Sequence, residues 1–139
     1  MFASLVDYHG GGAAAALEPL QDNIEAWEWT LATFIGAGVG TCYRGTQLFD
    51  SPQVQAMVTK WATFWTKYRR ILTEDIIHLR RPTVSTIDAI MHVSSVKQHP
   101  EDDVAGLAMV YNPTDVPVNT TIRLPCYYMG ITDVALVEE

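Results

Sequence analysis

The pattern of apolar residues changes once along this chain of 139 residues, between Leu72 and Asp75. Before Leu72, glycine-rich turns alternate with segments whose apolar residues recur every three or four positions, which is the spacing of an amphipathic helix. From Asp75 onward, short apolar runs are interrupted by prolines and asparagines, which is typical of short strands joined by turns. The sequence therefore predicts two parts, an α/β part over 1–74 and an all-β part over 75–139.

The first part contains two strand–helix units in succession. Short apolar runs at Phe2 to Val6 and Val39 to Tyr43 suit buried strands. Apolar stripes predict helices over Ile24 to Ile35 and over Val54 to Leu72, the second after a Ser51-Pro52 start signal. Strand–helix–strand connections are right-handed and make the strands parallel neighbours. We therefore predict the last βα units of a TIM-type (β/α)8 barrel.

The second part is predicted to be a small antiparallel β-sandwich. Regularly spaced short strands with proline-rich turns favour that architecture. The expected strands are Asp75 to Arg81, Ile87 to Val93, Gly106 to Tyr111, Val116 to Leu124 and Ile131 to Val137.

Polar side chains follow each of the two predicted parallel strands. Asp7 and His9 precede three glycines after the first strand, and Tyr43 and Arg44 close the second. Functional side chains of α/β barrels gather at such strand ends, so these four residues are candidate substrate-binding residues. Parallel strands align their ends, so Asp7 and Arg44 are expected to approach each other. The alternatives are an ordinary turn at Asp7 and a structural ion pair of Arg44 with Asp7 or Asp50.

Three other groups of residues carry weaker signals. Glu28 lies on the apolar stripe of the first helix, either as a carboxylate near the site or at the stripe's edge, reaching solvent or an arginine. His78 and His92 are favoured as structural histidines over a metal pair. Cys42 and Cys126 are favoured as free thiols over a disulfide. No metal or cofactor is predicted.

The charge excludes one class of partner and is compatible with another. The formal net charge is −7, whereas phosphate binding needs a basic surface, so nucleic acid is not expected as a partner. A neutral substrate such as a sugar is compatible with this charge.

No apolar run is long enough to span a membrane, and no secretory signal is expected at the first residues. The localisation is left open, and the sequon at Asn119 matters only in a secreted chain.

Several segments carry a resemblance to a known family. These segments are 8–12, 43–45, 61–72, 75–82, 106–113 and 124–130. With them the chain resembles the C-terminal end of a glycoside hydrolase-like protein with α-galactosidase-like architecture, in which a long helix leads from the barrel into an antiparallel β domain. The resemblance implies a carbohydrate partner. It also places the two catalytic carboxylates of such enzymes upstream of this chain, so its catalytic residues are unknown and the chain alone is expected to hydrolyse no common glycoside.

A second class of function stays open beside the hydrolase fragment. The chain is then a non-catalytic carbohydrate-binding or protein-interaction module whose aromatic platforms are Trp27, Tyr43, Tyr127 and Tyr128. In both cases the wide apolar stripes of the two helices exceed what two strands and a small β domain can cover. We therefore expect exposed apolar surface and self-association.

Overall fold

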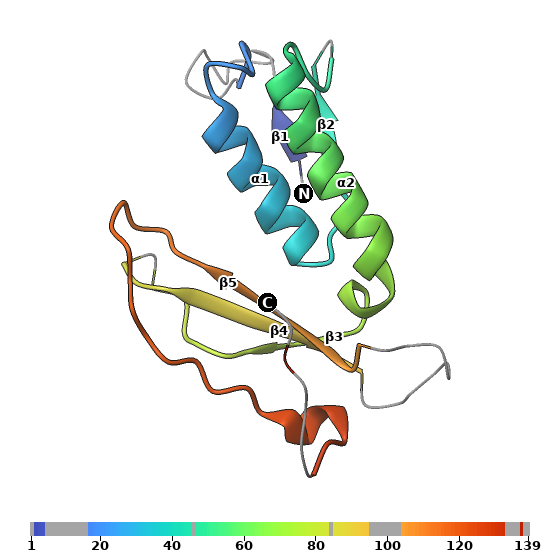
Figure 1. Ribbon diagram of the computed structural model, residues 1–139, viewed down its shortest axis with the longest axis vertical. Helices are drawn as coiled ribbons and strands as arrows, with labels where there is room; N and C mark the ends of the chain where they lie inside the picture. The colour runs from blue at the N-terminus through green and yellow to red at the C-terminus, as the bar shows by residue number, and fades with distance from the viewer. Residues whose placement is uncertain are drawn as a thin grey trace. The chain divides into compact units, whose positions relative to one another are not determined.

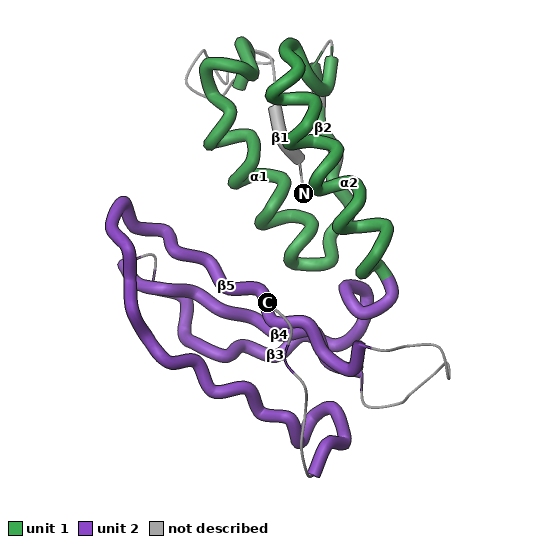
Figure 2. The backbone as a smooth tube through the Cα atoms, in the orientation of Figure 1, with its two compact units in different colours: residues 1–69 green, residues 70–139 purple. Residues whose placement is uncertain are grey.

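A computed structural model describes residues 2–4, 17–45, 47–83, 85–94, 104–132 and 137, with the backbone alone for 2–4, 42 and 44. The chain forms two compact units, Met1–Arg69 and Arg70–Glu139 (Figure 2). The division falls inside the second helix, a few residues before the predicted boundary between Glu74 and Asp75. Each unit is described by itself below.

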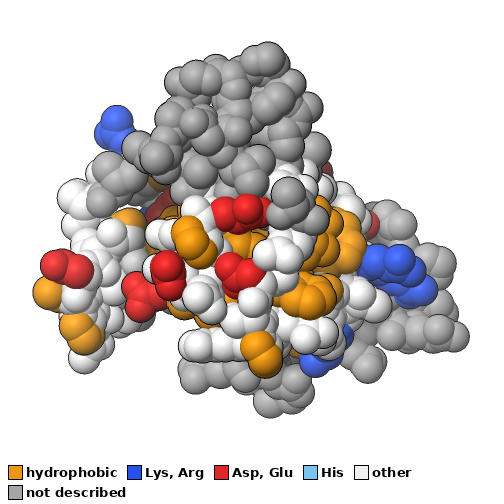
Figure 3. Space-filling model, turned by 90° about the horizontal axis from the view of Figure 1, so that it is seen from above, with side chains coloured by type: hydrophobic (Ala, Val, Ile, Leu, Met, Phe, Trp, Pro, Cys, Tyr) orange, Lys and Arg blue, Asp and Glu red, His pale blue; other side chains and the backbone are white. Residues whose placement is uncertain are grey.

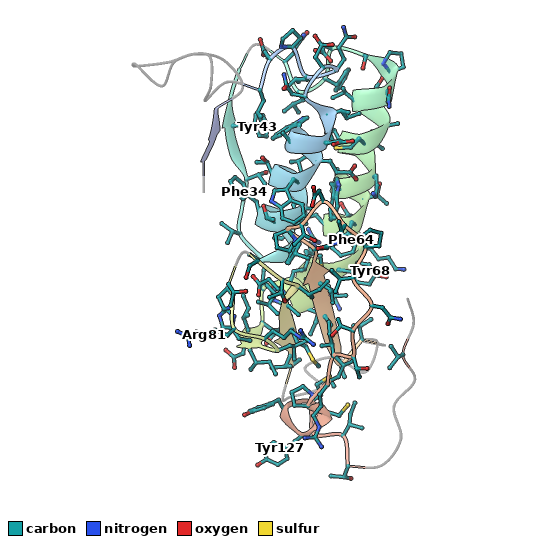
Figure 4. All side chains as sticks on the ribbon, turned by 90° about the vertical axis from the view of Figure 1, so that its left-hand side faces the viewer. Phe34, Tyr43, Phe64, Tyr68, Arg81 and Tyr127 are labelled. Atoms are coloured by element: carbon teal, nitrogen blue, oxygen red, sulfur yellow. The ribbon has the colours of Figure 1, made fainter. Side chains whose placement is uncertain are left out.

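Unit 1 consists of a parallel strand pair and two helices. Two helices, α1 and α2, lie side by side and cover one face of the strand pair (Figures 1 and 4). Strands β1 and β2 run parallel, with Ala3 opposite Tyr43, so the predicted parallel neighbours are confirmed. The elements of unit 1, in chain order, are β1 (Phe2–Ser4), α1 (Ile24–Gly36), β2 (Cys42–Arg44) and α2 (Pro52–Leu72), whose last turn belongs to unit 2.

The ends of both helices follow local chemistry. The hydroxyl of Ser51 accepts a hydrogen bond from the N–H of Val54 over 3.3 Å, so the predicted N-cap of α2 is confirmed. Asn23 holds the N-cap position of α1 without capping it, because its amide donates to the carbonyl of Pro19 instead. After α1, Gly38 adopts a left-handed conformation (φ 67°) and its N–H bonds the carbonyl of Ile35, which ends the helix.

The start of α2 is also tied to the turn that precedes α1. Oδ2 of Asp50 accepts hydrogen bonds from the backbone N–H groups of Leu20, over 2.6 Å, and Gln21, over 3.2 Å. Leu20 and Val54 of α2 are fully buried, and Trp27 of α1 is 1% exposed. Figure 3 looks onto the end at which both helices begin and shows acidic side chains among hydrophobic ones there. Negative charge at helix N-termini complements the helix dipole.

Unit 2 contains an antiparallel sheet in the order β3-β4-β5. Its strands are β3 (Asp75–His78), β4 (Asp88–Val93) and β5 (Gly106–Tyr111). The register places His78 opposite Ile90 and Asp88 opposite Tyr111. Five consecutive residues of β4, from 89 to 93, are buried, so both faces of the central strand are covered.

The segment after β5 is irregular and then forms a short 3-10 helix, η2 (Cys126–Met129). The side chain of Asn112 closes the turn after β5 by accepting from the N–H and hydroxyl of Thr114 and donating to the carbonyl of Val116. Further along, the guanidinium of Arg80 donates to the Thr120 hydroxyl over 2.7 Å and to the carbonyl of Thr121 over 3.0 Å. Side-chain bonds therefore hold this segment without a ladder of backbone bonds.

The predicted barrel end followed by a β-sandwich is wrong. The described residues form two helices with a pair of three-residue strands, and a three-stranded antiparallel sheet, which is too little for a barrel fragment and a two-sheet sandwich. The expected strand at Val116 to Leu124 does not form. Pro117 has no N–H to donate to a ladder, and Val116 and Val118 are exposed, so no sheet face holds them. The expected strand at Ile131 to Val137 begins irregularly, and most of it lies outside the described residues.

Candidate functional site: an aromatic groove in unit 1

A groove with a volume of about 300 Å³ lies in unit 1 where α1, α2 and β2 meet, and it is open to solvent on one side. Its walls come from α1, from the connection into β2 and from the middle of α2. We call it the aromatic groove, because tyrosine and tryptophan rings stand beside aliphatic side chains in its walls. The lining residues are Trp27, Leu31, Ile35, Val39, Gly40, Thr41, Tyr43, Leu48, Val58, Trp61, Ala62 and Trp65.

The inner wall of the groove is built on Trp27. This side chain is 1% exposed, and its indole N–H donates to the carbonyl of Leu48 over 3.3 Å. Tyr43 extends from β2 toward α1 and meets Trp27 edge to face, with 6.2 Å between the ring centroids (Figure 4). Tyr43 is 41% exposed, so it forms part of the mouth of the groove. One ring is therefore fixed in the interior while the other faces both the groove and solvent.

The opposite wall is the aromatic face of α2. Trp61 and Trp65 are one helical turn apart and both are half-buried. The ring of Trp61 also packs against Phe64, with centroids 5.5 Å apart, and Phe64 packs against Tyr68 at 4.9 Å. These neighbouring rings support the orientation of Trp61.

The rim of the groove carries an ion pair between the two helices. Oε1 of Glu28 on α1 accepts a hydrogen bond from Nζ of Lys60 over 2.7 Å and one from Nε1 of Trp61 over 3.1 Å. The bond from Lys60 is the largest cause that lowers the pKa of Glu28, the bond from Trp61 acts in the same direction, and partial burial opposes both. The carboxylate is therefore held charged beside a groove whose walls are mostly apolar.

Of the four candidate substrate-binding residues predicted at the strand ends, the structure describes the side chain of one. Tyr43 lies at the groove. Arg44 ends β2 and pairs with Ser4 of β1, but its side chain is outside the described residues, as are Asp7 and His9. The expected approach of Asp7 to Arg44 stays a prediction. Asp50, the other partner considered for Arg44, uses Oδ2 to bind the backbone at Leu20 and Gln21.

The aromatic residues predicted as platforms of a binding module differ in their exposure to solvent. Trp27 is 1% exposed and forms the inner wall of the aromatic groove, so it is not an exposed platform. Tyr127 and Tyr128 in η2 are 82% and 50% exposed, and their rings meet edge to face at 5.7 Å. Tyr127 projects away from the sheet of unit 2 (Figure 4). These two rings therefore form a second exposed aromatic feature, separate from the aromatic groove.

Histidine and cysteine side chains form no metal centre in the part of the chain that the structure describes. His92 is fully buried in β4, whereas His78 is exposed in β3. Among the described residues, no three His, Cys, Asp or Glu side chains are grouped as metal ligands. Cys126 carries a free thiol, and the side chain of Cys42 is not described.

Two functional features were missed by sequence reasoning. Of the two alternatives for Glu28, the carboxylate near the site is closer to the structure, but its partners, a lysine and an indole on the other helix, 32 and 33 residues away, were not predicted. The aromatic groove itself was missed because the apolar stripe that contains Trp61 and Trp65 was used to locate a helix and not a binding site. A sequence signal does exist, since the small residues Gly40 and Ala62 leave space beside the large rings.

No protein-family model matches this chain, and neither any curated protein nor any solved structure matches it. In the described part of the chain, neither helix is both long enough and apolar enough to cross a membrane.

Proposed function

We propose that this chain is a non-catalytic interaction module, and that the aromatic groove of unit 1 binds an aromatic or branched aliphatic side chain of a partner protein. The observation that carries the proposal is a groove of about 300 Å³ with Tyr43, Trp61 and Trp65 in its walls and an open side. Aromatic side chains are enriched at the centres of protein interfaces, and charged side chains surround them at the rim. The pair of Glu28 and Lys60 supplies such a rim.

The chemistry of the walls favours an apolar occupant over a sugar. Each hydroxyl of a sugar that enters a groove needs a hydrogen-bond partner, because an unpartnered buried hydroxyl is unfavourable. Most of the groove's lining is apolar, and the indole N–H groups of Trp27 and Trp61 are already bonded to Leu48 and Glu28. An apolar ring or branched side chain needs no such partners and gains from leaving water.

The hydrolase class of function receives no support from the fold. That interpretation relied on a barrel end followed by a β-sandwich, and the described residues form neither. The carbohydrate-binding form of the module keeps the exposed rings Tyr127 and Tyr128 as its platform. Binding of a sugar at these two rings is therefore the alternative outcome of the titration described next.

The proposal is tested by titration with small probes observed by NMR. Indole and p-cresol represent aromatic side chains, and methyl glucoside represents a sugar. We expect indole and p-cresol to shift the resonances of Tyr43 and the indole N–H signal of Trp61, while methyl glucoside leaves them unchanged. Shifts of the Tyr127 and Tyr128 resonances caused by methyl glucoside alone would favour a carbohydrate module, and unchanged spectra with both aromatic probes would contradict the proposal.

A matched pair of substitutions on α2 provides the control. Ala62 lines the groove, whereas Ala56 is an exposed alanine of the same helix that is not among the lining residues. Ala62→Leu fills the groove and should abolish the shifts, whereas Ala56→Leu should leave them intact. Equal effects of the two substitutions would place the probes elsewhere. A panel of short peptides that differ only in one central residue (Trp, Leu or Ser) then tests the protein partner, because only Trp and Leu peptides should bind.

A further inference from the structure

The short helix η2 is fastened to the sheet of unit 2 by a methionine that lies directly over a glycine. A Cβ atom built at Gly106 in β5 would overlap Sδ of Met129, and it would lie 2.8 Å from Cε of Met91 and 3.3 Å from the carbonyl oxygen of His92. The thioether of Met129 therefore occupies the space that any side chain at Gly106 would need. Met91 and Gly106 lie on adjacent strands, with Val93 opposite Gly106, so the contact spans β4 and β5.

The backbone of η2 provides only local support. Its hydrogen bonds, as the described residues show them, run between residues 124 and 131: from Cys126 to Leu124, from Tyr128 to Pro125, from Gly130 to Tyr127 and from Ile131 to Cys126. The two tyrosines of η2 are exposed. The side chain of Met129 thus provides a contact between this helix and the sheet.

The chemistry of this contact makes it sensitive to oxidation. A peroxide transfers one oxygen atom to a thioether, which gives methionine sulfoxide and water, or the corresponding alcohol from an organic peroxide. The sulfoxide is polar and larger than the thioether. The sulfur lies against the strand above Gly106, so an oxygen added on that side would overlap the strand. Met129 is half-buried and reachable, whereas Met91 is only 2% exposed.

We propose that Met129 is a redox-sensitive latch: oxidation of its sulfur by a peroxide releases η2 from β5 and frees the segment that carries Tyr127 and Tyr128. The latch is independent of the aromatic groove, which lies in unit 1. Reduction of the sulfoxide by a methionine sulfoxide reductase restores the thioether and reseats the helix.

The experiment measures chymotrypsin cleavage after Tyr127 and Tyr128 in the full chain. Cleavage of a locally opened segment follows the population of its open form when opening is fast. We expect dilute hydrogen peroxide to oxidise Met129 before Met91, as seen by mass spectrometry, and to raise cleavage at these two tyrosines by about 5- to 30-fold. Treatment with the reductase should return cleavage to its original rate.

Met129→Leu is the control, because leucine has a similar volume and cannot be oxidised. Peroxide should leave cleavage of this variant unchanged. The proposal is overturned if complete oxidation of Met129 leaves cleavage unchanged, if Met129→Leu shows the same rise, or if Met91 is oxidised first. In the last two cases the sensitive sulfur lies elsewhere in the chain.

Discussion

The carboxylate of Glu28 on α1 accepts a hydrogen bond from the indole N–H of Trp61 on α2, over 3.1 Å. The bond joins residues that are 33 positions apart and fixes one wall of the aromatic groove. Lys60 binds the same oxygen, so one carboxylate fixes the spacing of the two helices at the rim.

Glu28→Gln should lower stability by less than about 1 kcal/mol, because exposed ion pairs are screened by solvent and the amide oxygen still accepts from Trp61. The side chain of Glu28 is 37% exposed. Its lowered pKa means that the ion pair contributes stability above the ordinary carboxyl pKa of 4.5, and that this contribution is lost as the pH falls through the lower pKa of the folded state. Urea unfolding of the wild type at pH 7 and at pH 3 to 4 should show this loss.

The Glu28→Gln variant should lack that part of the pH dependence. Lys60→Gln should have an effect similar to that of Glu28→Gln at pH 7, and 1 M NaCl should reduce the difference from wild type. A salt-independent loss of several kcal/mol in either variant would show that the pair is shielded from solvent.

Tyr111 should make unit 2 sensitive to alkali. Burial, with a smaller effect of the Asp88 carboxylate, raises the pKa of Tyr111 to about 12 from its ordinary value of 10. The folded state then holds the phenol proton more tightly than the unfolded state, so this contribution to stability is fully present below pH 10 and is lost as the pH rises from 10 to 12. Because Tyr111 is only partly buried, solvent screening reduces the difference to roughly 1–2 kcal/mol. Urea unfolding at pH 8 and at pH 11.5 measures it, and Tyr111→Phe should remove most of the change.

Ser51→Ala should destabilise α2 by about 1 kcal/mol, because the N–H of Val54 loses its acceptor. Ser51→Asp should keep the cap and add favourable charge at the helix N-terminus, so its stability should equal or exceed that of the wild type. Urea unfolding followed by helical circular dichroism compares the three proteins. Equal stability of the alanine and aspartate variants would show that the hydroxyl of Ser51 does not act as a cap.

Two glycines should respond differently to the same substitution. Gly106→Ala must displace the ends of Met129 and Met91 and should lower stability by about 1 kcal/mol, whereas Gly106→Val should lower it by about 1–3 kcal/mol. A Cβ at Gly40 meets nothing within 4 Å, so Gly40→Ala should be neutral or stabilising by a few tenths of a kcal/mol. Thermal melts of the variants test both statements. A larger loss at Gly40 than at Gly106 would contradict the packing described here.

Several elements could be located from local sequence signals alone. Apolar spacing located both helices, Ser51-Pro52 located the start of α2, and two short apolar runs separated by a helix located the parallel pair β1 and β2. Three of the expected antiparallel strands also form, at β3, β4 and β5. In each case, a spacing or a cap within a few residues fixes the backbone, so nearby residues carry enough information.

The surroundings of these elements depend on contacts between segments that are far apart in the sequence. The strand pattern at Val116 to Leu124 did not become a strand, because a strand needs a neighbour to pair with, and Pro117 and the bond from Arg80 to Thr120 favour an irregular path. Val54 and Trp61 follow the same apolar spacing on α2, yet Val54 is buried and Trp61 is only half-buried. That division depends on which side chains stand opposite across the helix pair. Such contacts join residues about 30 positions apart, and no local spacing encodes them.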